Sequence, residues 1–159
     1  MDFDEDIRQQ ISTRYMLKIK LLAKNAIVPT IGSKNAAGLD LYAYIEEGDI
    51  TVKPFTTVKI RTGIAVEIPD GHFGGVYARS GLATKQGLRP SNCVGVIDSD
   101  YRGEVMVALY NDSDKPRKVV NGDRIAQLIM QPYLYAAIDI VDELSETDRG
   151  DGGFGSTGV

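Results

Sequence analysis

Alternation of apolar and polar residues with a period of two is the feature that most restricts the fold of this chain. The pattern runs through residues 15–21 and again through residues 39–44. Successive side chains of a strand point to opposite faces of a sheet, so this period predicts half-buried β-strands. Short runs rich in β-branched residues extend the prediction to residues 57–60, 64–68, 94–97, 105–110 and 125–130.

Turn residues separate these runs at short intervals, as in Pro69-Asp70-Gly71 and Asn121-Gly122-Asp123. Many short strands divided by such turns are typical of an all-β sandwich or barrel. The one short helix that we expect lies around residues 81–86. The sequence shows no linker and no internal repeat.

Length and charge limit the possible partners. A chain of 159 residues suits one domain with a real core. Its net charge of −4 gives no sign of a nucleic-acid partner. Cys93 is the single cysteine, which fits a reducing compartment. Neither a signal peptide nor an apolar run of membrane length is evident, so we expect a cytoplasmic protein without membrane contact.

The segment Arg149–Val159 holds five glycines, one arginine and one phenylalanine. Ordering each residue costs roughly 1–2 kcal/mol, and this composition buries too little apolar surface to offset that cost. Its backbone N–H groups and guanidinium suit phosphates, and its ring suits a base. We therefore expect a lid that orders on a ligand; the alternative is a disordered terminus without a role.

Polar residues interrupt the strand pattern in three more places. Asp40 lies inside the apolar run 37–43. In residues 78–83, Arg79, Ser80 and Gly81 stand where a strand gives way to the short helix, an arrangement that can cup a phosphate. The alternative there is a serine N-cap beside a solvated arginine. In the third place, residues 122–129, a turn feeds a strand that carries Arg124 and Gln127. Arg124 could face a ligand or pair with a carboxylate across a contact between subunits, and we favour the structural role.

The segment 92–104, NCVGVIDSDYRGE, is interpreted as a β-hairpin that turns near residues 100–103. Asp98 and Asp100 alternate with Ser99, so in an extended chain both carboxylates would leave the same face. The alternative is an acidic turn with no further role.

Together these segments resemble one family, the homotrimeric dUTP pyrophosphatases (dUTPases). AGLDLYA, ARSGLA, NCVGVIDSDYRGEV, GDRIAQLI and RGDGGFGSTG resemble its five motifs, in the same order. The resemblance implies a jelly-roll-like β fold assembled as a threefold trimer, with each active site drawn from three chains. It divides the chain into an extension of unknown role (1–14), a β domain (15–142) and a flexible lid (143–159).

The resemblance also implies the reaction dUTP + H₂O → dUMP + pyrophosphate with Mg²⁺, which keeps uracil out of DNA and supplies dUMP. Asp98 would orient and deprotonate the attacking water, with Gln127 assisting, and Asp40 would contact Mg²⁺ through water. Tyr101 under the sugar would reject UTP, and Phe154 would stack on uracil. The implied substrate-binding residues are Arg79, Ser80, Gly81, Asn92, Gly95, Val96, Ile97, Asp98, Tyr101, Met106, Gln127, Arg149, Phe154, Gly155, Ser156 and Thr157.

Two other functions stay open at the level of sequence. A dCTP deaminase shares this fold and would attack cytosine instead of phosphorus. A nucleotide sensor without catalysis would keep the binding residues alone. The GVIDSDYRGE run and the phenylalanine in the glycine-rich tail favour the pyrophosphatase pattern.

Overall fold

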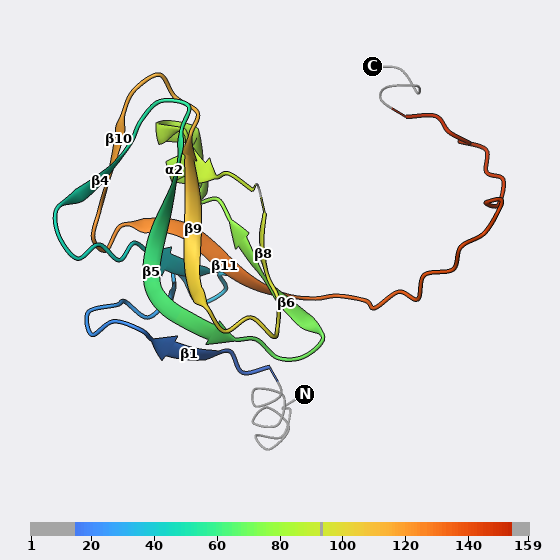
Figure 1. Ribbon diagram of the computed structural model, residues 1–159, viewed down its shortest axis with the longest axis horizontal. Helices are drawn as coiled ribbons and strands as arrows, with labels where there is room; N and C mark the ends of the chain where they lie inside the picture. Colours follow the sequence, from blue (N-terminus) through green and yellow to red (C-terminus); the bar gives the residue numbers. More distant parts are fainter. Residues whose placement is uncertain (1–14, 93, 154–159) are drawn as a thin grey trace.

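The computed structural model describes residues 15–92 and 94–153, and within them the chain forms a β-sandwich with one short helix (Figure 1). The elements are β1 Lys18–Leu21, β2 Thr30–Ile31, β3 Leu39–Tyr42, β4 Asp49–Val52, β5 Thr57–Glu67, β6 His72–Tyr77, α2 Ser80–Gln86, β7 Leu88–Pro90, β8 Gly95–Ile97, β9 Glu104–Asn111, β10 Arg117–Val120 and β11 Arg124–Pro132.

Two sheets enclose the core. One has the strand order β1-β5-β9-β7, the other has the order β2-β3-β11-β6-β8, and a separate ribbon pairs β10 with β4. Alternate residues of β9 are buried, as half-buried strands require. The fully buried side chains include Leu41, Ile60, Leu109 and Leu128. The predicted all-β, jelly-roll-like class with one short helix is confirmed, and the helix begins one residue before the predicted start.

One predicted hairpin is wrong in its pairing. The two arms of the segment 92–104 do not pair with each other: β8 pairs with β6, whereas β9 pairs with β5 and β7. The chain therefore crosses from one sheet to the other between Ile97 and Glu104. For β9 the partner β5 has 11 residues, whereas β8 has only three to offer.

A strand was expected to end before Arg79, but the bounds of β6 were not predicted, because Gly74 and Gly75 dilute its β-branched pattern. A Cβ at Gly74 would lie 2.8 Å from Ile68 Cδ1 and 2.9 Å from Leu128 Cδ1. The glycine is therefore required by close packing at the centre of the sandwich, where β11 and β8 flank β6.

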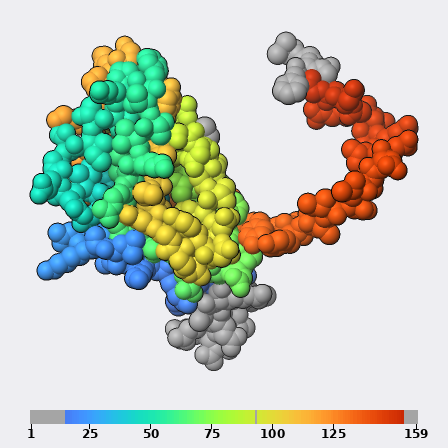
Figure 2. All heavy atoms as spheres, in the orientation of Figure 1, coloured from blue at the N-terminus to red at the C-terminus, as the bar shows by residue number. Residues whose placement is uncertain are grey.

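Beyond Pro132, the end of β11, residues 133–153 leave the body as an extended arm (Figures 1 and 2). The departure comes ten residues before the predicted start of the lid at 143. Five large apolar side chains of the arm are at least 87% exposed: Leu134, Tyr135, Ile138, Ile140 and Leu144. In the described part of the chain, no helix is long and apolar enough to cross a membrane.

Asn111 is a buried polar residue of the sandwich whose side chain takes part in four hydrogen bonds. Its Nδ2 donates to the carbonyls of Val52 (3.0 Å) and Lys115 (2.7 Å), and its Oδ1 accepts from Ser113 N (3.0 Å) and Oγ (2.7 Å). We expect Asn111→Ala to lower the free energy of unfolding by about 3 kcal/mol, because the buried Val52 carbonyl and the part-buried partners at Ser113 and Lys115 lose their hydrogen bonds. Urea denaturation measures this loss.

The matched control is Asn121→Ala, which removes a single bond that the exposed Asn121 Oδ1 accepts from Ile45 N (2.9 Å). Its expected cost is below about 1 kcal/mol. Equal losses for the two variants would contradict the role given to Asn111.

Candidate active site

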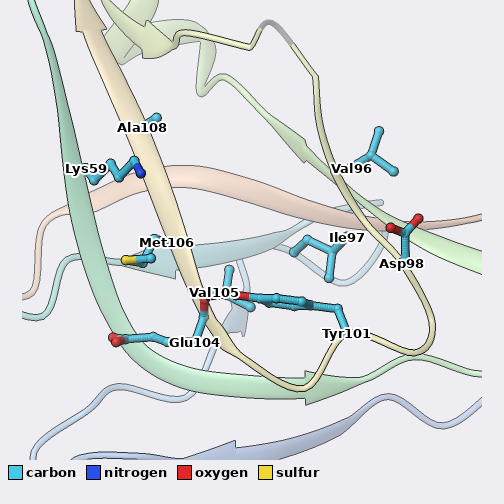
Figure 3. A pocket seen from close by; sticks show the side chains of 9 residues that line it. All are labelled: Lys59, Val96, Ile97, Asp98, Tyr101, Glu104, Val105, Met106 and Ala108. Carbon is cyan, nitrogen blue, oxygen red and sulfur yellow. Dashed lines mark hydrogen bonds between the residues drawn. The ribbon is translucent and has the colours of Figure 1, made fainter.

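The segment between β8 and β9 forms one wall of an open hollow of about 260 Å³ (Figure 3). The opposite wall comes from the outer face of β5 and β9. The side chains around it are those of Lys59, Val96, Ile97, Asp98, Tyr101, Glu104, Val105, Met106 and Ala108. Five of the predicted substrate-binding residues therefore line one hollow: Val96, Ile97, Asp98, Tyr101 and Met106.

The Tyr101 ring lies between the two walls (Figure 3). Its hydroxyl donates to the carbonyl of Glu104 at 3.1 Å. A Cβ at position 103 would lie 2.6 Å from Tyr101 Cζ, so Gly103 lets the ring settle against the backbone. The ring is 43% exposed and presents a flat surface to any molecule in the hollow.

Asp98 follows the last residue of β8, and its carboxylate is exposed. Tyr101 N donates to the Asp98 carbonyl at 3.2 Å, which closes a turn over residues 98–101. The expectation that Asp98 and Asp100 leave the same face of an extended chain is therefore wrong, since Asp100 lies inside this turn. Figure 3 shows Asp98 and Val96 on one side of the strand and Ile97 on the other.

Asn92 and Gly95 belong to the same segment. A Cβ at Gly95 would lie 3.0 Å from Asn92 Nδ2 and 3.1 Å from Val76 Cβ. The Asn92 amide therefore covers the backbone of Gly95 at the start of β8. Cys93, between them, lies outside the described residues.

A second group of polar side chains gathers around Asp40, which is buried on β3. Its Oδ1 accepts from Arg79 Nε at 2.9 Å, and its Oδ2 accepts from Arg124 Nη1 at 3.2 Å. Arg79 also donates through Nη1 to the Arg124 carbonyl at 3.4 Å. Two guanidiniums on one carboxylate leave a net positive charge, which suits an anion. The structural role that we favoured for Arg124 thus has a partner within the same chain.

Gln127 on β11 extends this second group. It pairs with Asp40 of β3 and Tyr77 of β6 in the sheet register, so these side chains share a face. A Cβ at Gly38 would lie 3.2 Å from Gln127 Cβ, which makes glycine the residue that leaves Gln127 room. Ser80 and Gly81 are exposed at the start of α2, directly after Arg79. Ser80 is not the N-cap, because Arg79 takes that position.

The two groups lie at opposite ends of β6. Ile97 pairs with Gly74, so Asp98 is level with Phe73, six residues before Arg79. At about 3.3 Å per residue, the Asp98 and Arg79 backbones are roughly 20 Å apart. Reacting atoms must approach to about 3–3.5 Å. One copy of the chain therefore does not bring Asp98 and the Arg79 group together on the same phosphorus.

The arm carries the remaining predicted residues. Arg149 Nε donates to the Gly152 carbonyl at 2.8 Å, a bond within the arm itself. Phe154, Gly155, Ser156 and Thr157 lie outside the described residues.

Comparison with known proteins decides the family. A family model described as dUTPase matches residues 24–158. The chain belongs to the dUTPase family. The resemblance read from the five motifs is confirmed.

Relatives of this dUTPase are similar to it in sequence over most of its length. It is 50% identical over 133 residues to the deoxyuridine 5'-triphosphate nucleotidohydrolase of Desulfitobacterium hafniense, covering 83% of this chain and 87% of that protein. Identity to the enzyme of the same name from Syntrophotalea carbinolica is 46%, covering 89% and 96%. The solved dUTPase of Staphylococcus bacteriophage 80alpha, a G164S mutant with dUpNHpp, superposes with a TM-score of 0.81 at 30% identity, covering 91% and 99%.

Sequence reasoning missed four residues of this dUTPase that line the hollow: Lys59, Glu104, Val105 and Ala108. Lys59 and Ala108 are paired across β5 and β9 and belong to no motif. Glu104 is the last residue of the segment 92–104. The signal available for it was a carboxylate that follows a glycine at the start of a strand.

Proposed function

We propose that this dUTPase hydrolyses dUTP to dUMP and pyrophosphate, with the nucleoside in the hollow between β8 and β9. The observation that carries the proposal is the grouping of Asp98 and Tyr101 around one hollow, next to β8, the edge strand of its sheet. The test is release of pyrophosphate from dUTP, compared with dCTP, dTTP and UTP. Ammonia released from dCTP would instead identify a deaminase, and binding without release would identify a sensor.

Base selection follows from the backbone at residues 95–98. Uracil presents two acceptors that flank one donor, and main-chain groups match this pattern. Cytosine replaces one acceptor by an amine, so a donor would face a donor, at a cost of roughly 1–3 kcal/mol. Phe154 stacks on the base from the lid, which adds roughly 1–3 kcal/mol.

Asp98 acts as the general base in this proposal. Its exposed carboxylate orients a water molecule and accepts a proton as the water oxygen attacks the phosphorus next to the sugar. A new P–O bond forms, the bond from that phosphorus to the bridging oxygen breaks, and pyrophosphate leaves. Arg79, Ser80, Gly81 and Gln127 stabilise the charge on the phosphates.

These residues belong to more than one chain. The separation of roughly 20 Å along β6 is bridged when one copy supplies Asp98 and Tyr101 and a second copy supplies Arg79 and Gln127. A third copy contributes its arm, whose exposed apolar side chains suit contact with the other copies. This arm places Arg149, Gly155, Ser156 and Thr157 over the phosphates. On this basis we propose that the protein is a homotrimer. We also propose that it is located in the cytoplasm.

Magnesium fits as an ion carried by the triphosphate. Among residues 15–92 and 94–153, no group of three or more His, Cys, Asp or Glu side chains is placed to hold a metal. Both Asp40 oxygens accept from guanidiniums, which leaves them lone pairs for a water of the ion. When bound, Mg²⁺ neutralises charge on the phosphates.

Asp40→Asn tests how Asp40 acts. We expect the KM for dUTP at saturating Mg²⁺ to rise about tenfold, because Arg79 and Arg124 lose their shared carboxylate. The control Asp49→Asn alters an exposed ion pair to Lys118 (2.7 Å) and leaves KM unchanged. If the Mg²⁺ requirement shifts while KM stays normal, Asp40 acts through the ion and not through Arg79.

Tyr101 is proposed as the gate against ribose. Its ring under the sugar leaves no room for a 2′-hydroxyl, so Tyr101→Ala is expected to narrow the preference for dUTP over UTP by about tenfold or more. The measurement is the ratio of the two kcat/KM values. An unchanged ratio would contradict the steric gate.

A further inference from the structure

Glu104 is the first residue of β9, and its side chain reaches toward β5 (Figure 3). The carboxylate accepts two bonds from Arg61 Nε, at 3.2 Å to Oε1 and 3.0 Å to Oε2. Oε1 also accepts from the backbone N–H of Gly63 at 2.8 Å. The side chain is 17% exposed, so these bonds are partly shielded from water.

The carboxylate closes an irregularity in β5. Arg61 pairs with Met106 and Ala65 pairs with Glu104, so residues 62–64 face Val105 alone. Such a bulge interrupts the ladder of backbone hydrogen bonds. Gly63 has a φ of 69°, and a Cβ there would lie 2.7 Å from Ala26 Cβ, so the bulge needs glycine.

Two side chains replace the missing ladder bonds of the bulge. Thr62 Oγ1 donates to the Val105 carbonyl at 2.5 Å, and Glu104 accepts from Gly63 N. Without the carboxylate, the part-buried Gly63 N–H would have no acceptor in the described structure other than water. Glu104 is therefore what fixes the start of β9 against β5.

Arg61 is itself held in place from the other side. Its Nη1 lies 3.3 Å from Glu46 Oε1, and its guanidinium lies 5.3 Å from the centre of the Tyr44 ring. The hydrogen bond to Glu104 is the largest of the influences that raise the pKa of Arg61. The arginine thus stays charged and gives Glu104 a fixed partner.

Tyr101 depends on the same residue through the backbone. Its hydroxyl donates to the Glu104 carbonyl at 3.1 Å, and no other partner of this hydroxyl occurs among the described residues. The carbonyl that holds the phenol and the carboxylate that closes the bulge belong to one residue. A shift at the start of β9 therefore moves the group that accepts the hydrogen bond of the Tyr101 hydroxyl.

We propose that Glu104 is a positioning residue: by fixing the start of β9, it holds Tyr101 in place as the gate against the 2′-hydroxyl. The inference rests on the proposed function, because it concerns the sugar selectivity of that site. Glu104 acts through Tyr101 and takes no part in proton transfer. Its effect is on selectivity between dUTP and UTP, more than on the rate with dUTP.

The experiment compares kcat/KM for dUTP and UTP in Glu104→Ala and Glu104→Gln. Glu104→Ala is expected to narrow the preference for dUTP about three- to tenfold, the effect of one or two lost hydrogen bonds. Glu104→Gln keeps an amide oxygen for Gly63 N, so its ratio is expected within about twofold of wild type. This rescue separates loss of the acceptor from loss of charge.

Asp49→Ala is the matched control, because it breaks an exposed ion pair of the β4–β10 ribbon, away from the hollow. Its ratio is expected to stay at the wild-type value. An unchanged ratio in folded Glu104→Ala would overturn the proposal, and so would an equal narrowing in Asp49→Ala. If Glu104→Ala does not fold, Tyr101→Phe decides: it keeps the ring but removes its hydrogen bond to the Glu104 carbonyl, and a ratio that does not narrow at all overturns the proposal. Wild type that releases no pyrophosphate from dUTP would overturn the proposed function itself.

Discussion

Asp98→Asn is expected to lower kcat for dUTP by about 10²- to 10⁴-fold, the range that a positioned general base contributes. The amide keeps the size of the side chain and still fits the end of β8, but it does not accept the proton of the attacking water. Binding should survive, because the hollow is shaped by backbone and by Tyr101. Turnover is measured as pyrophosphate release, and binding by calorimetry with the imido analogue dUpNHpp.

Asp100→Asn is the matched control for Asp98. Asp100 is an exposed carboxylate two residues away, inside the turn that follows β8. Its replacement should leave kcat near the wild-type value. Near-normal turnover in Asp98→Asn, or an equal loss in both variants, would remove Asp98 from the role of base.

Deleting residues 149–159 is expected to lower kcat/KM by about 10²-fold or more while the assembly stays intact. The deletion removes Arg149 and Phe154, which we propose to pair with phosphate and to stack on the base. One charge-assisted contact with one stacked ring accounts for roughly 2.5–6 kcal/mol. It spares the apolar part of the arm, residues 133–144, which we assign to contact between copies. Light scattering measures the assembly and pyrophosphate release measures the activity.

Phe154→Leu serves as the milder companion of the deletion. It keeps an apolar group but loses the ring, so we expect an intermediate loss in kcat/KM, seen mainly in KM. Full activity in the truncated chain would contradict the lid, and a smaller assembly would mean that the last eleven residues hold the copies together.

The sequence predicted those strands that can be recognised from the pattern of their own side chains. The run over residues 105–110 predicted β9, in which alternate residues are buried. In β3 the neighbours Asp40 and Leu41 are both buried, so the alternation there does not mark one buried face. The bounds of β6 were not predicted, since packing against Ile68 and Leu128 demands glycine where a strand former would be expected. The pairing of β8 failed for a similar reason: the choice between partner strands depends on the whole sandwich and not on the turn between two neighbours.

The site residues likewise divide into those that a local pattern predicts and those that depend on contacts distant in sequence. Asp98 and Tyr101 lie in one motif and Met106 directly follows it, so a contiguous pattern was enough to place them together. The partners of Asp40 are 39 and 84 residues away in sequence, and no local rule assigns two guanidiniums to one carboxylate. Glu104 was missed because its role depends on a bulge in β5, and no periodic pattern in the sequence marks that bulge.

A mixing experiment with two inactive variants tests directly whether the active site is shared between copies. Asp98→Asn and Arg79→Ala are each expected to be nearly inactive alone. Unfolded together in equal amounts and refolded, they should regain activity at about a quarter of the sites, because a site needs Asp98 from one copy and Arg79 from another. No regain in mixed assemblies, with each refolded variant still able to assemble, would show that one chain holds the whole site and would contradict this account.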